Sequence, residues 1–178
     1  MVTSADSNTT RMTYSRVAGF TFLFYIAIGI FSLSLSDDLP VTDLLILLLN
    51  LSALTLGVTL YMLTREQGPA IALLALTCRI MEAIHAQSPI FFAVGSLLFC
   101  WLLLRGRMIP PVLAWLGVIA SALLVVILPS QLAGVLLGSG WSESSTWLIW
   151  LPMLVFEVTL SFWLLIRGVA VPKSTATV

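Results

Sequence analysis

The chain has 178 residues, of which 60% are hydrophobic and only 9% are charged, and its mean hydropathy is +1.09. A soluble domain carries roughly a quarter charged residues, so this composition excludes a soluble globular protein, a disordered chain and a disulfide-stapled scaffold. The formal net charge is zero, which also argues against a nucleic-acid partner. The composition therefore predicts an integral membrane protein.

Apolar segments long enough to cross a bilayer recur along the chain. A transmembrane helix needs about 20 mainly apolar residues, and a helix is required because unpaired backbone groups are costly in lipid. We expect an all-α bundle of six spans (residues 17–168), after a polar cytoplasmic segment 1–16 and before a cytoplasmic tail 169–178. The spans are predicted at 17–35, 43–63, 69–87, 89–104, 112–128 and 147–166. Pro129 is expected to stop or kink the fifth span.

Charged residues between the spans predict the orientation of the chain. If all six segments cross, one side holds Arg11, Arg16, Arg65, Arg105, Arg107, Arg167 and Lys173. The other side holds Asp37, Asp38, Asp43 and Glu143, with no Lys or Arg. Cytoplasmic loops carry the excess of Lys and Arg, so we expect both termini in the cytoplasm. Without the third span, Arg105 and Arg107 would lie outside while Arg65 stayed inside, which favours six spans.

Ionisable side chains inside the predicted spans mark a candidate site. Arg79, Glu82 and His85 follow one another at i, i+3 and i+6 on the third span and share one helix face. Helix rise places Arg79 and Glu157 of the sixth span near the midplane, where they could form an ion pair, and Asn50 of the second span near the level of Glu82. Such groups cost roughly 2.5–3.5 kcal/mol each to insert and need partners. We predict that these five residues line a polar, outward-opening ligand site.

Three functions fit this cluster. The first is binding or passage of a small polar or amphipathic ligand, with Arg79 anchoring an anionic group and Glu82 or Glu157 countering its charge. The second is an accessory or assembly subunit of a membrane complex, in which an Arg79–Glu157 pair only holds helices together. The third is an intramembrane enzyme for a lipophilic substrate, with Glu82 and His85 as acid and base. No nucleophile motif accompanies these residues, so no catalytic residue is assigned.

The sequence predicts neither a cofactor nor a metal site. A single histidine excludes bis-histidine haem within one chain, and too few further metal ligands accompany it. Cys78 and Cys100 lie in apolar runs, where a thiol usually serves as a small packing residue. The expected partners are membrane lipid and a small-molecule ligand, and a bundle this small is also compatible with a homodimer or a membrane-protein partner.

Short motifs recur in order along the chain. Arg16-Val17-Ala18-Gly19 opens the first span, Arg79-Ile80-Met81-Glu82-Ala83 lies in the third, and the last contains Phe156-Glu157-Val158-Thr159. In this order they resemble a family of small bacterial multi-pass membrane proteins known only as a domain of unknown function. The resemblance implies a helical bundle of the bacterial inner membrane with Arg79, Glu82 and Glu157 as recurring polar positions. It implies no activity.

Overall fold

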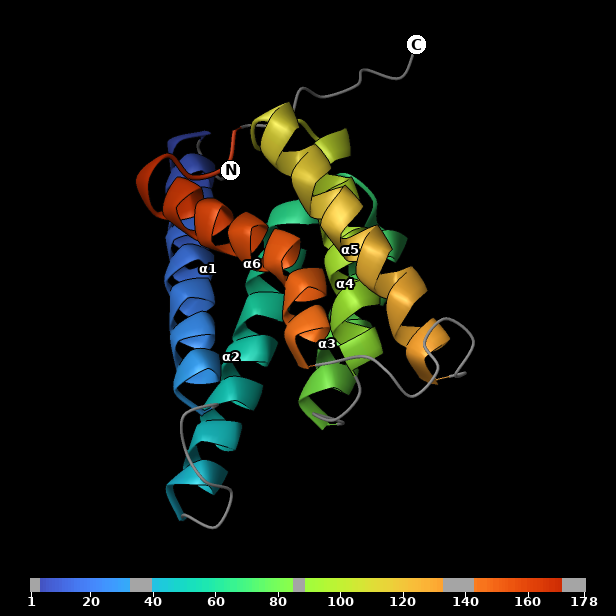
Figure 1. Cartoon of the computed structure of the whole chain (residues 1–178). Helices are drawn as coiled ribbons and strands as arrows, with labels where there is room; N and C mark the ends of the chain where they lie inside the picture. The colour runs from blue at the N-terminus through green and yellow to red at the C-terminus, as the bar shows by residue number, and fades with distance from the viewer. Residues whose placement is uncertain (1–3, 33–39, 85–88, 133–142, 171–178) are drawn as a thin grey trace.

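The computed structural model describes residues 4–32, 40–84, 89–132 and 143–170, and these segments form helices joined by short turns. The helices are α1 (Ser4–Ser32), α2 (Pro40–Thr64), α3 (Pro69–Ile84), α4 (Pro89–Arg105), α5 (Pro111–Leu132) and α6 (Glu143–Ile166). Successive helices run in opposite directions, so that α1 begins and α6 ends at the same end of the bundle (Figure 1). The predicted all-α fold is confirmed.

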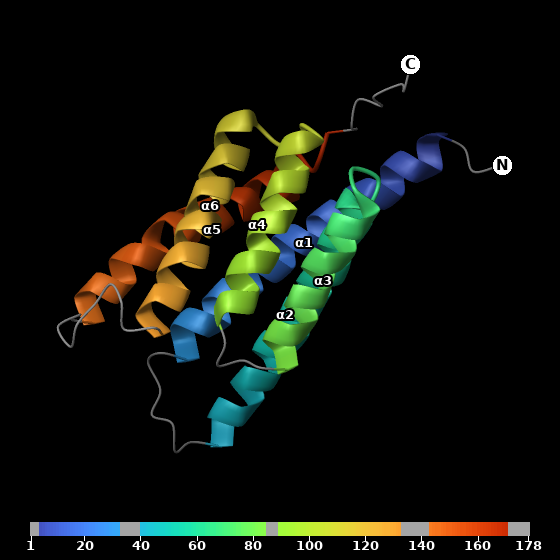
Figure 2. The ribbon, with the colours of Figure 1, turned by 90° about the vertical axis from the view of Figure 1, so that its right-hand side faces the viewer.

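The six helices form a closed ring. Each helix contacts its neighbours in sequence, and α6 returns to contact α1, while α2 also touches α4. Figure 2 shows the ring turned by 90°, with α3, α4 and α5 in front of α1 and α2. Fully buried apolar side chains fill its interior, among them Leu56, Phe99, Leu124, Phe156 and Leu160.

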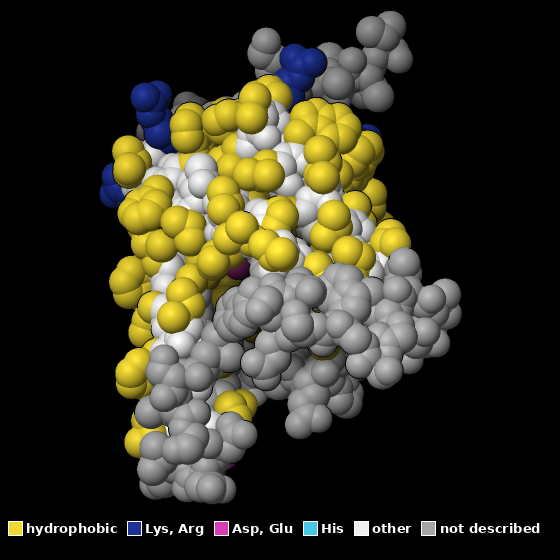
Figure 3. Space-filling model, viewed as in Figure 1, with side chains coloured by type: hydrophobic (Ala, Val, Ile, Leu, Met, Phe, Trp, Pro, Cys, Tyr) yellow, Lys and Arg dark blue, Asp and Glu magenta, His cyan; other side chains and the backbone are white. Residues whose placement is uncertain are grey.

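The outer surface of the bundle is apolar. Large hydrophobic side chains are about half exposed or more, among them Phe20, Val58, Ile119, Leu148 and Phe162. Hydrophobic side chains cover much of the face seen in Figure 3. A soluble protein rarely exposes so extensive an apolar surface. Lipid is the solvent that accommodates it.

Helix length and hydropathy agree with a membrane location. Four segments of the described chain are long and apolar enough to cross a bilayer, namely 9–32, 41–64, 111–130 and 148–166. Helix α4 is apolar but has 17 residues, and α3 has 16 residues and carries Arg79 and Glu82. The protein is therefore a membrane-like helical protein, and the two shorter helices lie next to each other in the ring.

Several helices extend beyond the predicted spans. Helix α1 begins at Ser4, so the polar segment before residue 17 is largely a continuation of the first helix. Helix α5 does not stop at Pro129 but continues to Leu132, and α6 passes through Pro152. Membrane helices tolerate proline because neighbouring groups satisfy the carbonyl that it frees. The predicted end of the third span at residue 87 lies outside the described residues.

Contacts at the end shared by α1 and α6 close the ring. The Ala170 N–H donates to the Met108 carbonyl at 2.8 Å, and the Val169 N–H donates to Ser15 Oγ at 3.3 Å. Gly168 adopts a φ of 69°, a left-handed conformation that favours glycine, as the chain turns away from α6. The segment after α6 thereby joins α1 to the turn between α4 and α5.

Candidate functional site

Two glycines allow α3 to pack closely between α2 and α4. A Cβ added to Gly57 of α2 would lie 2.9 Å from the Cβ of Arg79, and one added to Gly95 of α4 would lie 3.1 Å from the Cβ of Cys78. Small residues at such crossings let helix backbones approach closely in membranes. The stem of Arg79 is therefore enclosed by backbone, and its side chain is 1% exposed.

Arg79 forms its ion pair with the next turn of its own helix. Its Nη1 donates to Glu82 Oε2 at 2.6 Å. The other carboxylate oxygen of Glu82 accepts a hydrogen bond from the hydroxyl of Tyr25 on α1, at 3.1 Å. Glu82 therefore links α1 to α3 across the ring, because these two helices are not neighbours.

An aromatic ring of α4 packs against the guanidinium of Arg79. Its Cζ lies 4.9 Å from the centroid of the Phe92 ring on α4, a cation–π geometry. The Phe92 ring packs against Trp150 of α6, with centroids 5.7 Å apart. Phe92 therefore connects the charged pair on α3 to α6.

Glu157 of α6 is the second acidic group of the interior. It is 5% exposed, and its Oε1 is buried without a hydrogen-bond partner. The Nε of Arg79 is also buried and unpaired. The two residues interact electrostatically, but the salt bridge of Arg79 is with Glu82. Arg79 could have paired with either glutamate, and it pairs with Glu82, which is one turn away on the same helix.

Of the two remaining predicted site residues, the structure describes only Asn50. Asn50 is half-buried on α2, and none of the hydrogen bonds or ion pairs described for the chain connects it to Arg79, Glu82 or Glu157. His85, with its predicted place in the site, lies outside the described residues. The structure thus brings together three of the five predicted residues, two of them in direct contact.

Tyr25 is the member of the cluster that sequence reasoning missed. It lies well inside the first predicted span, and it is one of three tyrosines in the chain. Tyrosine is usually found at the membrane surface, because its hydroxyl needs a polar partner. The position of Tyr25 deep within a predicted span therefore indicates that a hydrogen-bond acceptor is buried near its hydroxyl.

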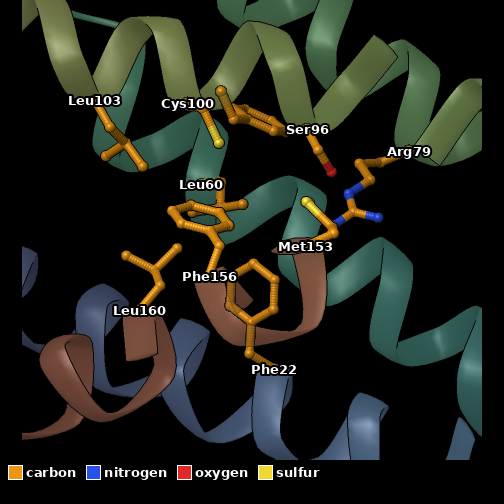
Figure 4. Close-up of a pocket in the computed structure, with 10 residues that line it drawn as sticks. Phe22, Leu60, Arg79, Ser96, Cys100, Leu103, Met153, Phe156 and Leu160 are labelled. Atoms are coloured by element: carbon orange, nitrogen blue, oxygen red, sulfur yellow. The ribbon is translucent and has the colours of Figure 1, made fainter. Parts of the chain in front are cut away.

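A small cavity adjoins Arg79 in the ring interior (Figure 4). Its volume is about 10 Å³, which is room for about one water molecule. Its polar lining comes from Arg79 and Ser96, and its apolar lining from Phe22, Leu60, Phe99, Cys100, Leu103, Met153, Phe156 and Leu160. Pockets for drug-sized ligands measure roughly 300–1,000 Å³, so this cavity does not hold a ligand of that size.

Few charged side chains are visible on the face of the bundle seen in Figure 3. Figure 3 shows an acidic side chain in a recess at mid-height, alongside α6 and at the border of the part drawn in grey. Basic side chains lie instead at the end where α1 begins and α6 ends. Within the segments that the structure describes, no group of three or more His, Cys, Asp or Glu side chains could hold a metal ion.

Comparison with known proteins identifies one family. Residues 84–168 match the model of a domain of unknown function (DUF4386), which confirms the resemblance to an uncharacterised family over that segment. The match runs from the last residue of α3 through α6, so it includes Glu157 but not Tyr25, Arg79 or Glu82. Searches of curated proteins and of solved structures find no match to the chain.

Proposed function

We propose that the protein is a six-span membrane protein that binds a small polar ligand, or passes it through the bilayer, at the buried cluster of Tyr25, Arg79, Glu82 and Glu157. The observation that supports this function is the pair of unpartnered atoms, Arg79 Nε and Glu157 Oε1. A buried polar atom without a partner costs about 1–3 kcal/mol. A ligand that pairs with both atoms would recover that free energy on binding.

The charges of the cluster favour a ligand with hydrogen-bond donors or positive charge. The charge of Arg79 is already balanced by Glu82 at 2.6 Å, whereas Glu157 keeps an open acceptor. An anion anchored on Arg79 would have to displace Glu82. Asn50 and His85 remain proposed as outer members of the site.

We further propose that all six helices cross the bacterial inner membrane, with the basic end of the bundle in the cytoplasm. Helices α3 and α4, of 16 and 17 residues, are about 24–26 Å long, slightly short of about 30 Å of hydrocarbon. Exposed basic residues flank the helices at one end and include Arg16, Arg65, Arg105, Arg107 and Arg167. The excess of Lys and Arg marks the cytoplasmic side of membrane proteins.

An accessory subunit is the alternative, and the location of the ion pair argues against its simplest form. In that form, a salt bridge between two helices fixes which of them meet. The salt bridge of Arg79 lies within α3 and cannot do so. The third function, an intramembrane enzyme, depends on His85, which lies outside the described residues.

Thermal unfolding in detergent tests ligand binding. The purified full-length protein would be compared with Arg79→Met and Glu157→Gln across a panel of amines, amino acids and organic anions. We expect at least one donor-bearing compound to raise the Tm of the wild type and of neither variant. Thr159→Val, an exposed change on the same helix as Glu157, is the matched control and should keep the shift. If no compound shifts the wild type and both variants simply lose stability, the cluster is structural and the accessory-subunit alternative gains.

A further inference from the structure

The buried cluster contains one carboxylate more than its cation can balance. Arg79 and Glu82 form a 2.6 Å ion pair, and Tyr25 adds a neutral hydroxyl that donates to Glu82. Glu157 is left with a buried oxygen and no hydrogen-bond donor. An ionised carboxylate is very costly in a low-dielectric interior unless it is paired, and an unpaired one is neutralised by binding a proton.

Among the residues that the structure describes, no neighbouring group supplies the missing positive charge. The titratable side chains that act on Glu157 are Tyr25 of α1, Arg79 and Glu82 of α3, and Cys100 of α4. Arg79 is the one cation among them, and it is engaged with Glu82. Helix α5, which packs directly on α6, contributes Ser121, whose hydroxyl donates to the Gly117 carbonyl at 2.7 Å.

The space in the interior limits what else could bind Glu157. The cavity beside Arg79 has a volume of about 10 Å³ and admits at most about one water molecule. An organic cation would have to enlarge this cavity on binding, whereas a proton requires no cavity. Glu157 is 5% exposed, so its carboxyl group is not fully enclosed by the bundle.

We propose that Glu157 is a proton-binding site of the membrane interior: it is held as the neutral carboxylic acid, and this proton is the positive group that the cluster exchanges. The inference deepens the proposed function, because it names the ligand of the same cluster. Arg79 pairs with Glu82 at 2.6 Å, whereas Oε1 of Glu157 has no hydrogen-bond partner. Glu82 is therefore the glutamate with a cationic partner, and Glu157 is the one that exchanges the proton.

Reaction with dicyclohexylcarbodiimide tests this assignment. The reagent is apolar, enters lipid and adds to a carboxyl group only when that group is protonated, giving a stable N-acylurea. The full-length protein in liposomes would be treated over a range of pH, digested and mapped by mass spectrometry. We expect the label on Glu157 to exceed that on Glu82 by about tenfold or more, because only Glu82 has a cationic partner. The label on Glu157 should fall as pH rises.

Two variants distinguish protonation of Glu157 from a general reactivity of buried carboxyl groups with the reagent. Arg79→Met removes the cation that pairs with Glu82, so Glu82 should become labelled as well, which a purely structural role for the cluster does not produce. Glu157→Gln has nearly the shape of the neutral acid, so it should lose the label and keep the Tm of the wild type. Exposed Asp43 and Glu66 provide a positive control, because a water-soluble carbodiimide with an amine nucleophile should modify them and spare Glu157.

Mapping the label on the wild-type protein tests proton binding by Glu157 even if a variant does not fold. An unlabelled Glu157, or equal labelling of Glu82 and Glu157, would overturn it. A compound that stabilises the wild type while Glu157 stays unlabelled would support ligand binding by the cluster and refute proton binding by Glu157. If Glu157 is labelled and no compound stabilises the protein, the result would support proton binding by Glu157 and refute the binding of larger polar ligands.

Discussion

At the scale of single residues, two glutamates are candidate partners for Arg79: Glu82 on the same helix and Glu157 on the last one. The spacing of Arg79 and Glu82 places both on one helix face, and the structure joins them at 2.6 Å. The depth of Glu157 in the last span made it an equally plausible partner for Arg79. Depth alone does not say which helices touch, and α3 and α6 are separated in the ring. Helix packing therefore determines which of the two glutamates pairs with Arg79.

Tyr25→Phe should destabilise the bundle at the residue scale. The change removes the hydroxyl that donates to Glu82 at 3.1 Å and leaves the ring in place. Hydrogen bonds between membrane helices average roughly 0.6 kcal/mol, but this acceptor is charged, so we expect a loss of about 1–2 kcal/mol. Chemical unfolding in mixed micelles measures it.

Tyr61→Phe is the matched control for that loss. Tyr61 is a half-buried tyrosine on α2, outside the polar cluster. It should change stability by much less than Tyr25→Phe. Equal effects of the two changes would mean that the bond to Glu82 does not stabilise the fold.

At the scale of the helix, glycine determines how close α3 comes to its neighbours. Gly57 of α2 and Gly95 of α4 both face α3, and a side chain on either would meet α3 within about the contact distance of two carbon atoms. The sequence places Gly57 in the second predicted span and Gly95 in the fourth, but it could not pair a particular glycine with Arg79. That pairing depends on the rotation and crossing angle of two helices, which periodicity does not supply.

Gly57→Ala should separate α2 from α3. Its Cβ would lie 2.9 Å from the Cβ of Arg79 and 3.1 Å from Leu76 Cδ1, and the former atom is fixed to the helix backbone. Overpacking of this kind costs about 1–3 kcal/mol, and we expect a Tm lowered accordingly. Gly29→Ala is the control, because nothing lies within 4 Å of its added Cβ. A Gly57 variant as stable as the Gly29 variant would refute the close contact.

At the scale of the whole molecule, the helix arrangement and the distribution of charge predict the same orientation of the bundle in the membrane. An even number of alternating helices returns α6 to the end where α1 begins (Figure 1), and the exposed basic residues gather there (Figure 3). The segment after α6 closes this end through Ser15 and Met108. We therefore expect one end of the bundle to be cytoplasmic throughout.

Cysteine labelling in intact cells tests this topology. Asp43 and Glu66 are exposed at opposite ends of α2, so Asp43→Cys should react with an impermeant maleimide from outside and Glu66→Cys only after permeabilisation. The wild type provides the background, because Cys78 and Cys100 are both buried. The reverse pattern would invert the proposed orientation, and labelling of both positions from one side would mean that α2 does not cross.

The sequence by itself determined the class of the protein: a helical membrane protein, the positions of its helices and the polar residues of α3 and α6. These follow from composition, hydropathy and helical periodicity, which are local properties. Only the tertiary structure decided that the helices close into a ring, that Tyr25 joins the site and that Arg79 pairs with Glu82 rather than Glu157. Lipid surrounds every apolar face equally well, so hydrophobicity cannot select which helices meet. Close packing at glycines and the pairing of a few buried polar groups make that selection.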